Sequence, residues 1–209
     1  MCGILGYYNK RNKDLDEFKR MLNSLKNRGP DDEGLWQDHS SGILLGHRRL
    51  AILDLSKNGH QPMVSNSERY ILVFNGEIYN HLDIRSEINK NYNFKNLKWK
   101  GSSDSETILN SVEVFGFNKT ITMLKGMFAI GVLDRKKNIL LLARDRFGEK
   151  PLYYGSFNGS IFFASELKPL SYCKNFTKKV DSKVINLYLK YGYVPAPYSI
   201  YLNIKKLEP

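Results

Sequence analysis

The second residue of the chain is a cysteine, followed by Gly3 and an apolar run over residues 4–8. Removal of Met1 would leave a thiol and a free α-amine on this one residue. A thiolate is a strong nucleophile, and an N-terminal amine titrates near ~7.7–8.0, so the amine can serve as general base for the thiol. Cysteine is also a small buried hydrophobe in many strands. Cys2 taken alone leaves a catalytic and a structural interpretation open.

Metal chemistry is not expected from the other candidate ligands. The chain holds only two cysteines, Cys2 and Cys173, and neither a CxxC nor an HExxH spacing occurs. The four histidines are dispersed along the sequence, so no zinc site is expected. Cys173 is predicted to be an inert thiol.

The net charge of +11 invites a nucleic-acid interpretation. The lysines are scattered, however, and the densest basic spots are pairs such as Lys136-Lys137. Since no nucleic-acid-binding motif accompanies them, no nucleic-acid partner is expected. No apolar run approaches the length of a membrane span, and the N-terminus lacks the features of a signal peptide. We therefore expect a cytoplasmic protein without a membrane partner.

Seven sequence segments carry more specific information than any single residue. In chain order they are MCGILGYY, RGPDDEG, GHRRLAILDLSKNGHQPM, FNGEIYNH, GSSDSETIL, KGMFAIGVLDRKKNILLLARDRFGEKPLYYG and FASELKPL. Together they resemble the glutaminase domain of the asparagine synthetases, a class II glutamine amidotransferase of the N-terminal-nucleophile type. The resemblance covers about residues 2–170. GEIYN and RDRFGEKPLYYG are more similar to the asparagine synthetase branch than to the purine or glucosamine amidotransferases.

The resemblance implies a role for each matching residue. Cys2 would attack the side-chain amide carbon of L-glutamine, and Asn75 and Gly76 would donate hydrogen bonds to the oxyanion that forms. Arg49 would bind the α-carboxylate of the substrate and Asp104 its α-ammonium. The same pocket would be lined by further residues of the matching motifs: Leu50, Ala51, Ile52, Leu53 and Glu77.

Each of these assignments has a structural alternative. Asn-Gly is also the most common tight hairpin turn. Arg49 could be a solvated charge at the end of a strand, and Asp104 a helix N-terminal residue favoured by the helix dipole. We expect His47 and His60 to be structural groups, and residues 145–151 to form an architectural loop between strands.

Hydrophobic spacing predicts the elements that must position these residues. Helices are expected over residues 14–25, 81–89 and 181–191, and from Ser103 with the apolar face Ile108, Leu109, Val112 and Phe115. Residues 28–34 read as a loop. Strands are predicted at residues 3–8, 42–46, 49–53, 69–75, 126–133, 138–143, 151–155 and 160–164, with hairpin turns at 134–138 and 158–159.

Hairpins joined by short turns imply antiparallel sheets, and the amphipathic helices need a sheet face to cover, which gives an α+β fold. The resemblance implies a four-layer αββα sandwich of two antiparallel sheets covered by helices. It places a glutamine amidotransferase domain at residues 1–180. Residues 181–209 are predicted to begin the linker to a synthetase domain.

The implied reaction is hydrolysis of L-glutamine to glutamate and ammonia, with no cofactor in this domain. The ammonia would pass to an ATP-dependent asparagine synthetase domain, to which ATP and Mg²⁺ would belong. No SGGxDS pyrophosphate loop occurs in the chain. Apolar surface exposed without that partner is expected to favour a homodimer. Two alternatives stay open: a non-catalytic module that binds glutamine or a partner, and the glutaminase half of an enzyme that amidates another carboxylate.

Overall fold

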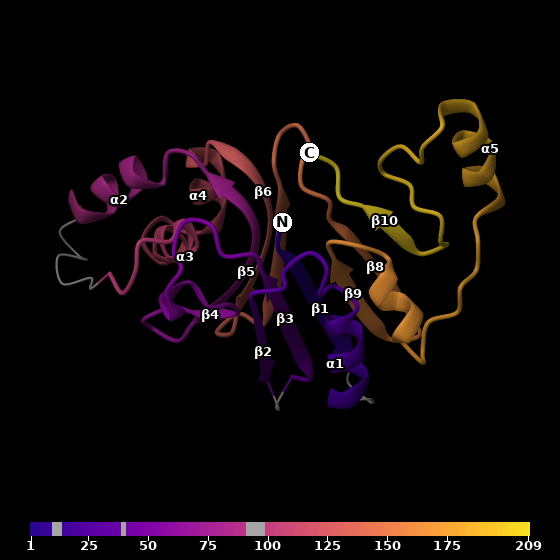
Figure 1. The fold of residues 1–209 in the computed structure, drawn as a ribbon, viewed down its shortest axis with the longest axis horizontal. Coiled ribbons are helices and arrows are strands. Elements are labelled where there is room, and N and C mark those ends of the chain that lie inside the picture. Colours follow the sequence, from indigo (N-terminus) through magenta and orange to yellow (C-terminus); the bar gives the residue numbers. More distant parts are fainter. Residues whose placement is uncertain (10–13, 39–40, 91–98) are drawn as a thin grey trace.

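The fold consists of two antiparallel sheets packed face to face. The computed structural model describes residues 1–9, 14–38, 41–90 and 99–209. Sheet A has the strand order β10-β8-β9-β1-β3-β2, and sheet B has the order β4-β5-β6-β7 (Figure 1). The strands of sheet A are β1 (Gly3–Asn9), β2 (Asp32–Asp38), β3 (Ile43–Arg49), β8 (Tyr153–Phe157), β9 (Ser160–Ala164) and β10 (Ile204–Lys206). Those of sheet B are β4 (Met63–Val64), β5 (Tyr70–Ile78), β6 (Gly126–Asp134) and β7 (Ile139–Arg144).

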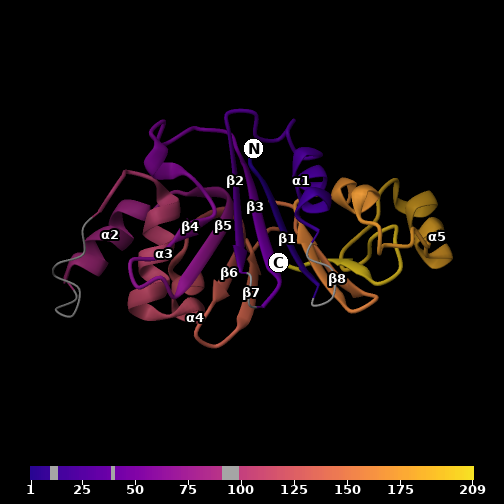
Figure 2. The same ribbon diagram turned by 90° about the horizontal axis from the view of Figure 1, so that it is seen from below.

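Helices cover the outer face of each sheet. The described α-helices are α1 (Leu15–Asn23), α2 (His81–Lys90), α3 (Asp104–Phe115), α4 (Phe117–Met123) and α5 (Ser182–Tyr191). Figure 2 shows α2, α3 and α4 on the side of sheet B and α1 on the side of sheet A. Two short 3-10 helices, η1 (Lys57–Gly59) and η3 (Lys168–Tyr172), complete the described helical segments.

Three apolar clusters separate the layers. Between the sheets, Ile4 and Leu45 of sheet A meet Val73 of sheet B. Outside sheet A, Phe18 and Leu22 of α1 pack with the sheet, and outside sheet B the α3 side chains pack with β5 and β6. Each sheet therefore buries both faces, and the predicted α+β, four-layer αββα sandwich is confirmed.

The hairpins follow the sequence patterns closely. Asn158 and Gly159 join β8 to β9 with φ of 47° and 73°, the left-handed conformation that a two-residue turn requires. A longer loop, residues 135–138, joins β6 to β7, and Asn138 at its end has φ of 53°. The predicted turns at 134–138 and 158–159 are therefore confirmed.

The strand predicted at residues 49–53 is wrong. β3 runs without interruption from Ile43 to Arg49, and the chain leaves the sheet at Leu50. The reason is a set of polar contacts beyond the strand. The Arg49 guanidinium donates to the backbone carbonyls of Asp54 and Ser56, which draws the following loop back over the end of β3.

The predicted loop over residues 28–34 overlaps a strand. β2 begins at Asp32 and pairs along its length with β3, from Asp32 opposite Arg49 to Asp38 opposite Ile43. Its sequence, DEGLWQD, is polar because β2 is the outer strand of sheet A and most of its residues are only partly buried. Polar composition resembles a loop, whereas the partner strand makes it part of the sheet.

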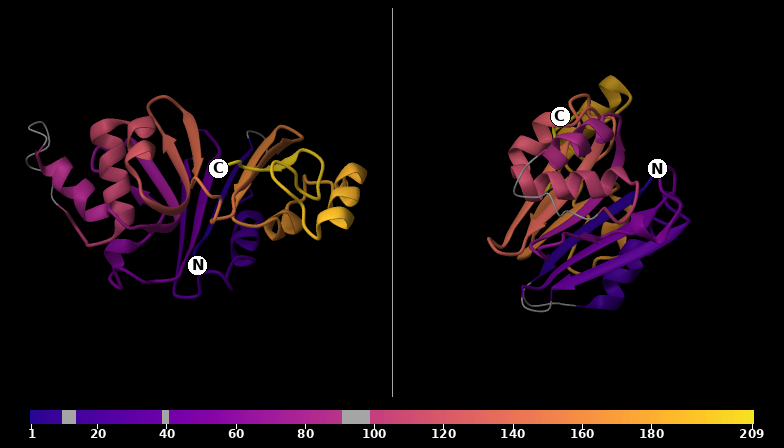
Figure 3. Two further views of the ribbon diagram at one scale, coloured as in Figure 1. Left: turned by 90° about the horizontal axis from the view of Figure 1, so that it is seen from above. Right: turned by 90° about the vertical axis from the view of Figure 1, so that its left-hand side faces the viewer.

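The tail folds back onto sheet A. β10 pairs with β8, placing Ile204 opposite Gly155, and the Leu207 N–H donates to the Leu152 carbonyl. Before it, α5 lies at the opposite end of the molecule from α2 (Figure 3). The division of the chain at residue 180 stays a prediction. No described helix has the length and apolarity needed to cross a membrane.

Candidate functional site

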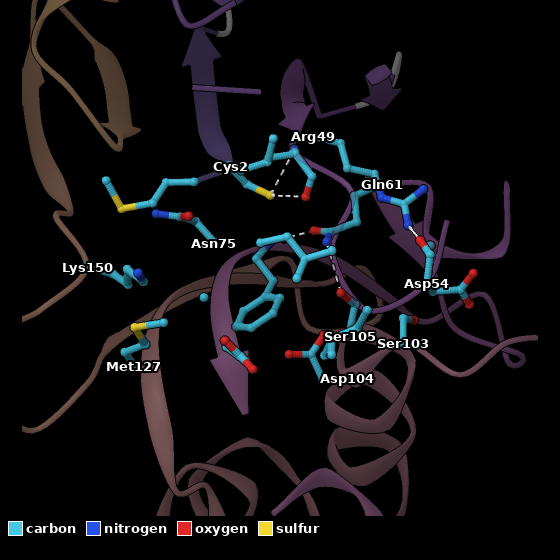
Figure 4. A pocket seen from close by; sticks show the side chains of 18 residues that line it. Cys2, Arg49, Asp54, Gln61, Asn75, Ser103, Asp104, Ser105, Met127 and Lys150 are labelled. Atoms are coloured by element: carbon cyan, nitrogen blue, oxygen red, sulfur yellow. Dashed lines mark hydrogen bonds between the residues drawn. The ribbon is translucent and has the colours of Figure 1, made fainter. Parts of the chain in front are cut away.

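One pocket collects side chains from four separate elements. Its cavity volume is about 130 Å³, and it is lined from the start of β1, the end of β3, the middle of β5 and the first turn of α3. Cys2, Arg49, Asn75 and Asp104 all lie on it, although they are up to a hundred positions apart in the sequence. Figure 4 shows these side chains arranged around a common space.

Cys2 is held at the entrance to β1 by contacts to its sulfur and its carbonyl. The Leu50 N–H donates to Sγ at 3.4 Å. The Arg28 Nε donates to the Cys2 carbonyl at 2.9 Å, and Arg28 is itself paired with Glu166 at 2.9 Å. Burial raises the pKa of the Cys2 thiol, and the Leu50 hydrogen bond offsets part of that rise. Such a thiol stays protonated at neutral pH and needs a neighbouring base to become a nucleophile.

Asn75 lies inside β5, opposite Ala129 of β6, and is only 1% exposed. The Asn-Gly pair is therefore not a hairpin turn. The Nδ2 group of Asn75 has no hydrogen-bond partner among the described residues. A buried amide left unpaired costs about 1–3 kcal/mol, so this donor is available for an acceptor that enters the pocket.

The backbone of Gly76 faces the same pocket. Successive residues of a strand point their backbone groups to alternate edges. The N–H groups of Phe74 and Ile78 both bond to side chains on the edge of β5 away from β6, at Gln61 and Asp104. Gly76 lies midway between them, so its N–H points to that edge as well. It lies beside the Asn75 side chain, at the pocket wall.

Arg49 is fixed by the loop that follows it. Its Nη1 donates to the Ser56 carbonyl at 2.9 Å, and its Nη2 to the Asp54 carbonyl. A guanidinium has five N–H donors, so donors remain after these two bonds. The residue is 8% exposed and lines the pocket. It provides a cation with a fixed orientation.

Asp104 is the first residue of α3, and Ser103 caps the helix through its side chain, which accepts from the Glu106 N–H at 3.3 Å. Asp104 Oδ2 accepts from the Ile78 N–H at 3.0 Å. Burial and, to a smaller extent, the nearby Glu77 carboxylate raise the pKa of Asp104 to about 6, against the lowering effect of its backbone hydrogen bonds. The pocket therefore presents an anion across from the Arg49 cation.

The structure brings all but one of the predicted site residues into this pocket. Its lining includes Cys2, Arg49, Leu50, Ile52, Leu53, Asn75, Gly76, Glu77 and Asp104. Ala51 is the exception, because it lines a neighbouring hollow and its N–H donates to Asp31 at 2.9 Å. The Ala51 N–H is thereby used outside the cavity.

Among the further residues that line the pocket, two buried polar side chains are absent from the predicted site. Gln61 and Lys150 both lie on the pocket and are only 4% and 7% exposed. They belong to the motif segments GHQPM and GEKPLYYG, so their place in these motifs is the sequence feature that could have identified them as pocket residues. Lys150 was instead assigned to an architectural loop, and that assignment misses its place on the pocket wall.

His47 is a neutral structural group in this arrangement. Burial lowers its pKa to about 4, although the hydrogen bond to Phe74 acts in the opposite direction. Its Nε2 lies 3.0 Å from the Phe74 carbonyl, and since a carbonyl only accepts, this nitrogen donates. Within the described residues, no group of three or more histidine, cysteine or acidic side chains is arranged to hold a metal ion.

The fold and the pocket together define a class of protein. All of residues 1–209 match the family described as "Glutamine amidotransferase domain", and the chain belongs to that family. Among solved structures, a glutamine phosphoribosylpyrophosphate (PRPP) amidotransferase from B. subtilis shares the fold, with a TM-score of 0.67 and 20% identity over 81% of this chain and 43% of that one. This is the amidotransferase fold of the N-terminal-nucleophile type.

The curated relatives narrow the class. The chain is 38% identical, over its full length, to a putative asparagine synthetase [glutamine-hydrolyzing] 2 of Methanocaldococcus jannaschii, of which it covers 42%. It is 36% identical to asparagine synthetase [glutamine-hydrolyzing] 1 of Bacillus subtilis, of which it covers 32%. The resemblance predicted from the seven motifs is confirmed. The chain spans less than half the length of either relative.

Proposed function

We propose that this chain hydrolyses L-glutamine to glutamate and ammonia through a covalent thioester on Cys2. The observation that carries the proposal is the meeting of a cysteine thiol with the unpaired buried amide of Asn75 on one pocket wall. A nucleophile and an oxyanion donor at one cavity are the two requirements of acyl transfer. Family membership supplies the substrate class.

The nucleophile is activated by the amine of its own residue. Met1 is 54% exposed, and its removal frees the α-amine of Cys2. The amine accepts the thiol proton while sulfur bonds to the amide carbon of glutamine, and the carbonyl oxygen takes the electron pair. The Asn75 Nδ2–H and the Gly76 N–H donate to this oxyanion. The new ammonium then gives its proton to the departing nitrogen, which leaves as ammonia.

Water completes the reaction. The same amine takes a proton from water, and the oxygen attacks the thioester carbon. The carbon–sulfur bond breaks, glutamate is released, and the proton returns to the thiolate. Each step uses one nucleophile, one base and one oxyanion site, so neither a metal ion nor an organic cofactor is part of it.

The charged side chains fix the orientation of the substrate. An α-amino acid carries one carboxylate and one ammonium on the same carbon. Arg49 and Asp104 present the complementary charges on the pocket wall. The carboxylate of glutamine binds the remaining donors of Arg49, and the ammonium binds Asp104. Its side chain then extends toward Cys2 and Asn75.

The ammonia has a proposed destination in a longer protein. The relatives named as glutamine-hydrolysing asparagine synthetases are more than twice as long as this chain. We assign the added length to an ATP-dependent synthetase domain that makes asparagine and holds ATP and Mg²⁺. Residues 181–209 lead to it, and α5 offers Tyr188 and Leu189, 53% and 75% exposed, as its docking face. Without this partner, two copies of the chain pair through the same face as a homodimer.

Both cysteines are free, and Cys173 is buried beside the Tyr7 hydroxyl at 3.7 Å. Unpaired cysteines fit a reducing compartment, which supports a cytoplasmic location.

A second candidate function follows from the position of Met1. Met1 itself lies on the pocket. While it is retained, the nitrogen of Cys2 is part of a peptide bond and cannot accept a proton. A chain that keeps Met1 would bind glutamine without turnover, as a non-catalytic module.

The deciding experiment measures intact mass and glutamine-dependent ammonia release on the same sample. The native chain is expected to lack Met1 and to release ammonia, and Cys2→Ala is expected to release none. Cys173→Ala is the matched control, because this thiol is buried away from the pocket, and it keeps its activity. Equal ammonia release by Cys2→Ala would overturn the proposal. A processed, correctly folded native chain that binds glutamine without releasing ammonia would favour the binding module.

A further inference from the structure

The strand that carries Asn75 and Gly76 runs beyond its neighbour on one side. β4 pairs with β5 only at Leu72 and Ile71, opposite Met63 and Val64. From Phe74 onward, no described strand bonds to that edge of β5. Backbone groups on an open, buried edge must find other partners, since an unpaired buried N–H or C=O costs about 1–3 kcal/mol.

Two side chains replace the missing strand at Phe74. The Phe74 N–H donates to Gln61 Oε1 at 2.6 Å, and the Phe74 carbonyl accepts from His47 Nε2 at 3.0 Å. Both side chains are buried, with exposures of 4% and 1%. Phe74, the residue immediately before Asn75, is therefore held by side chains at both its backbone N–H and its backbone carbonyl.

Gln61 also reaches the opposite wall of the pocket. Its Nε2 donates to Ser105 Oγ at 3.0 Å, and Ser105 directly follows Asp104 at the start of α3. The Gln61 amide thus links Phe74, which precedes the proposed oxyanion donor Asn75, to Ser105, which follows the proposed ammonium anchor Asp104. Both ends of the side chain are used, one as acceptor and the other as donor.

We propose that Gln61 is a positioning residue that aligns Asn75 and Gly76 with a substrate held at Asp104. The inference rests on the proposed glutaminase function and names the group that sets the geometry of its oxyanion site. Hydrogen-bond donors stabilise an oxyanion only when they are preorganised at the right distance. A displacement of about 1 Å can reduce a rate by about 10²-fold.

The chemistry of the position explains why an amide is suited to it. An aliphatic side chain of similar size fills the space but leaves the Phe74 N–H without an acceptor. A glutamate keeps an acceptor for Phe74, and Ser105 can then donate its own hydroxyl proton to the second oxygen. The isosteric glutamate is therefore the conservative replacement, and leucine is the disruptive one.

The test compares three variants of the 209-residue chain after Met1 removal. Gln61→Leu is expected to lower kcat for ammonia release by about 10- to 100-fold, while KM and inhibition by glutamate change less than about threefold. Gln61→Glu is expected to recover most of this loss. Ser111→Ala removes a buried hydrogen bond to Thr120, 3.0 Å long, between α3 and α4. It controls for stability and keeps the native kcat.

A second measurement does not depend on turnover. Amide hydrogen exchange at Phe74 is expected to be faster in Gln61→Leu than in the native chain and unchanged in Ser111→Ala. Native kcat in Gln61→Leu, or native exchange at Phe74, overturns the inference. So does an equal loss in kcat and in glutamate binding, because general disorder predicts that pattern. If the processed native chain itself releases no ammonia, it is the proposed function that fails.

Discussion

The chain contains three Asn-Gly pairs, of which Asn58-Gly59 ends the short helix η1 and the other two contrast in structure. Asn158 and Gly159 form the turn between β8 and β9, both with positive φ. Asn75 and Gly76 lie within β5, and neither has a positive φ. The same dipeptide thus serves in one place as a turn and in the other as part of an extended strand at the pocket.

The environments of the two pairs differ as much as their backbones. Asn158 Nδ2 donates to the Asn175 carbonyl at 2.8 Å, whereas Asn75 Nδ2 is buried without a partner in the described structure. A Cβ on Gly159 would meet nothing within 4 Å, but one on Gly76 would lie 2.2 Å from the Met127 carbonyl oxygen. The turn uses Asn-Gly for its backbone freedom. The strand uses it for an available donor and for close approach to β6.

The largest expected effect separates the two asparagines. Asn75→Ala should lower kcat for ammonia release by about 10²–10³-fold, because one oxyanion donor is lost. Its free energy of unfolding should not fall and should rise by up to about 1–3 kcal/mol, since the buried amide removed had no partner in the described structure. Asn158→Ala should leave kcat unchanged and lower the free energy of unfolding by about 1 kcal/mol. Steady-state kinetics and urea denaturation measure both. Native kcat in Asn75→Ala would contradict the oxyanion assignment.

The two glycines give the next largest effect. Gly76→Ala must move β5 away from β6, so we expect at least a tenfold loss of kcat, with about 1–3 kcal/mol of unfolding free energy lost to overpacking. Gly159→Ala strains only a positive φ, which costs about 1–2 kcal/mol, and should keep native kcat. The two variants are expected to lose similar amounts of unfolding free energy but to differ in kcat. If both variants lose activity in proportion to stability, Gly76 has no special role.

The smallest effect concerns Asp104, a second buried polar group of the pocket. Burial raises its pKa to about 6, and only the carboxylate can bind the substrate's ammonium. We therefore expect the affinity for L-glutamine to fall about fourfold between pH 7 and pH 5.5. Titration calorimetry of L-glutamine with Cys2→Ala measures this without the catalytic proton transfers, and a constant affinity over that range would contradict it.

The raised pKa of Asp104 also predicts how the free energy of unfolding depends on pH. The folded pKa of Asp104 lies above the ordinary value of 3.8, so its stabilising contribution is complete below about pH 4 and is lost as the pH rises through 6. Asp104→Asn should therefore be more stable than the native chain at pH 8 by about 1–3 kcal/mol, and no more stable at pH 4. Asp134→Asn is the matched control with the opposite sign. The Arg69 partner, 2.7 Å away, lowers the pKa of Asp134, so this variant should be destabilised at pH 8.

The predictions that failed share a physical origin. Residues 32–38 have the composition of a loop, and they form a strand because β3 offers them a partner. Residues 204–206 are too short to show any periodicity, and they become β10 by pairing with β8, about fifty positions earlier. Residues 49–53 have the apolar composition of a strand, but the contacts of Arg49 with its own loop end the strand. In each case a partner distant in sequence or a side-chain contact outweighs local preference.

The candidate site shows the same contrast between local sequence signals and distant contacts, residue by residue. The motifs that carry the family resemblance were sufficient to select Cys2, Arg49 and Asp104 as candidates, whereas the residue types alone left a structural alternative open for each. Ala51 belongs to the same motif as its neighbours, yet it lines a neighbouring hollow, where its N–H bonds to Asp31. Gln61 was passed over because a buried glutamine has no distinctive chemistry until its two partners are known.

The sequence by itself indicated the hairpins through local backbone preference, and through its resemblance to a family it indicated the candidate nucleophile, the candidate charged anchors and the αββα class, because turns and motifs are patterns of neighbouring residues. Tertiary structure alone decided that Asn75-Gly76 lies inside a strand at the pocket, that the Asn75 amide stays unpaired there, and that Gln61 bonds to the strand beside it. Hydrogen-bond partners come from distant segments, and they are assigned only when the layers pack and water is excluded from the open edge of β5.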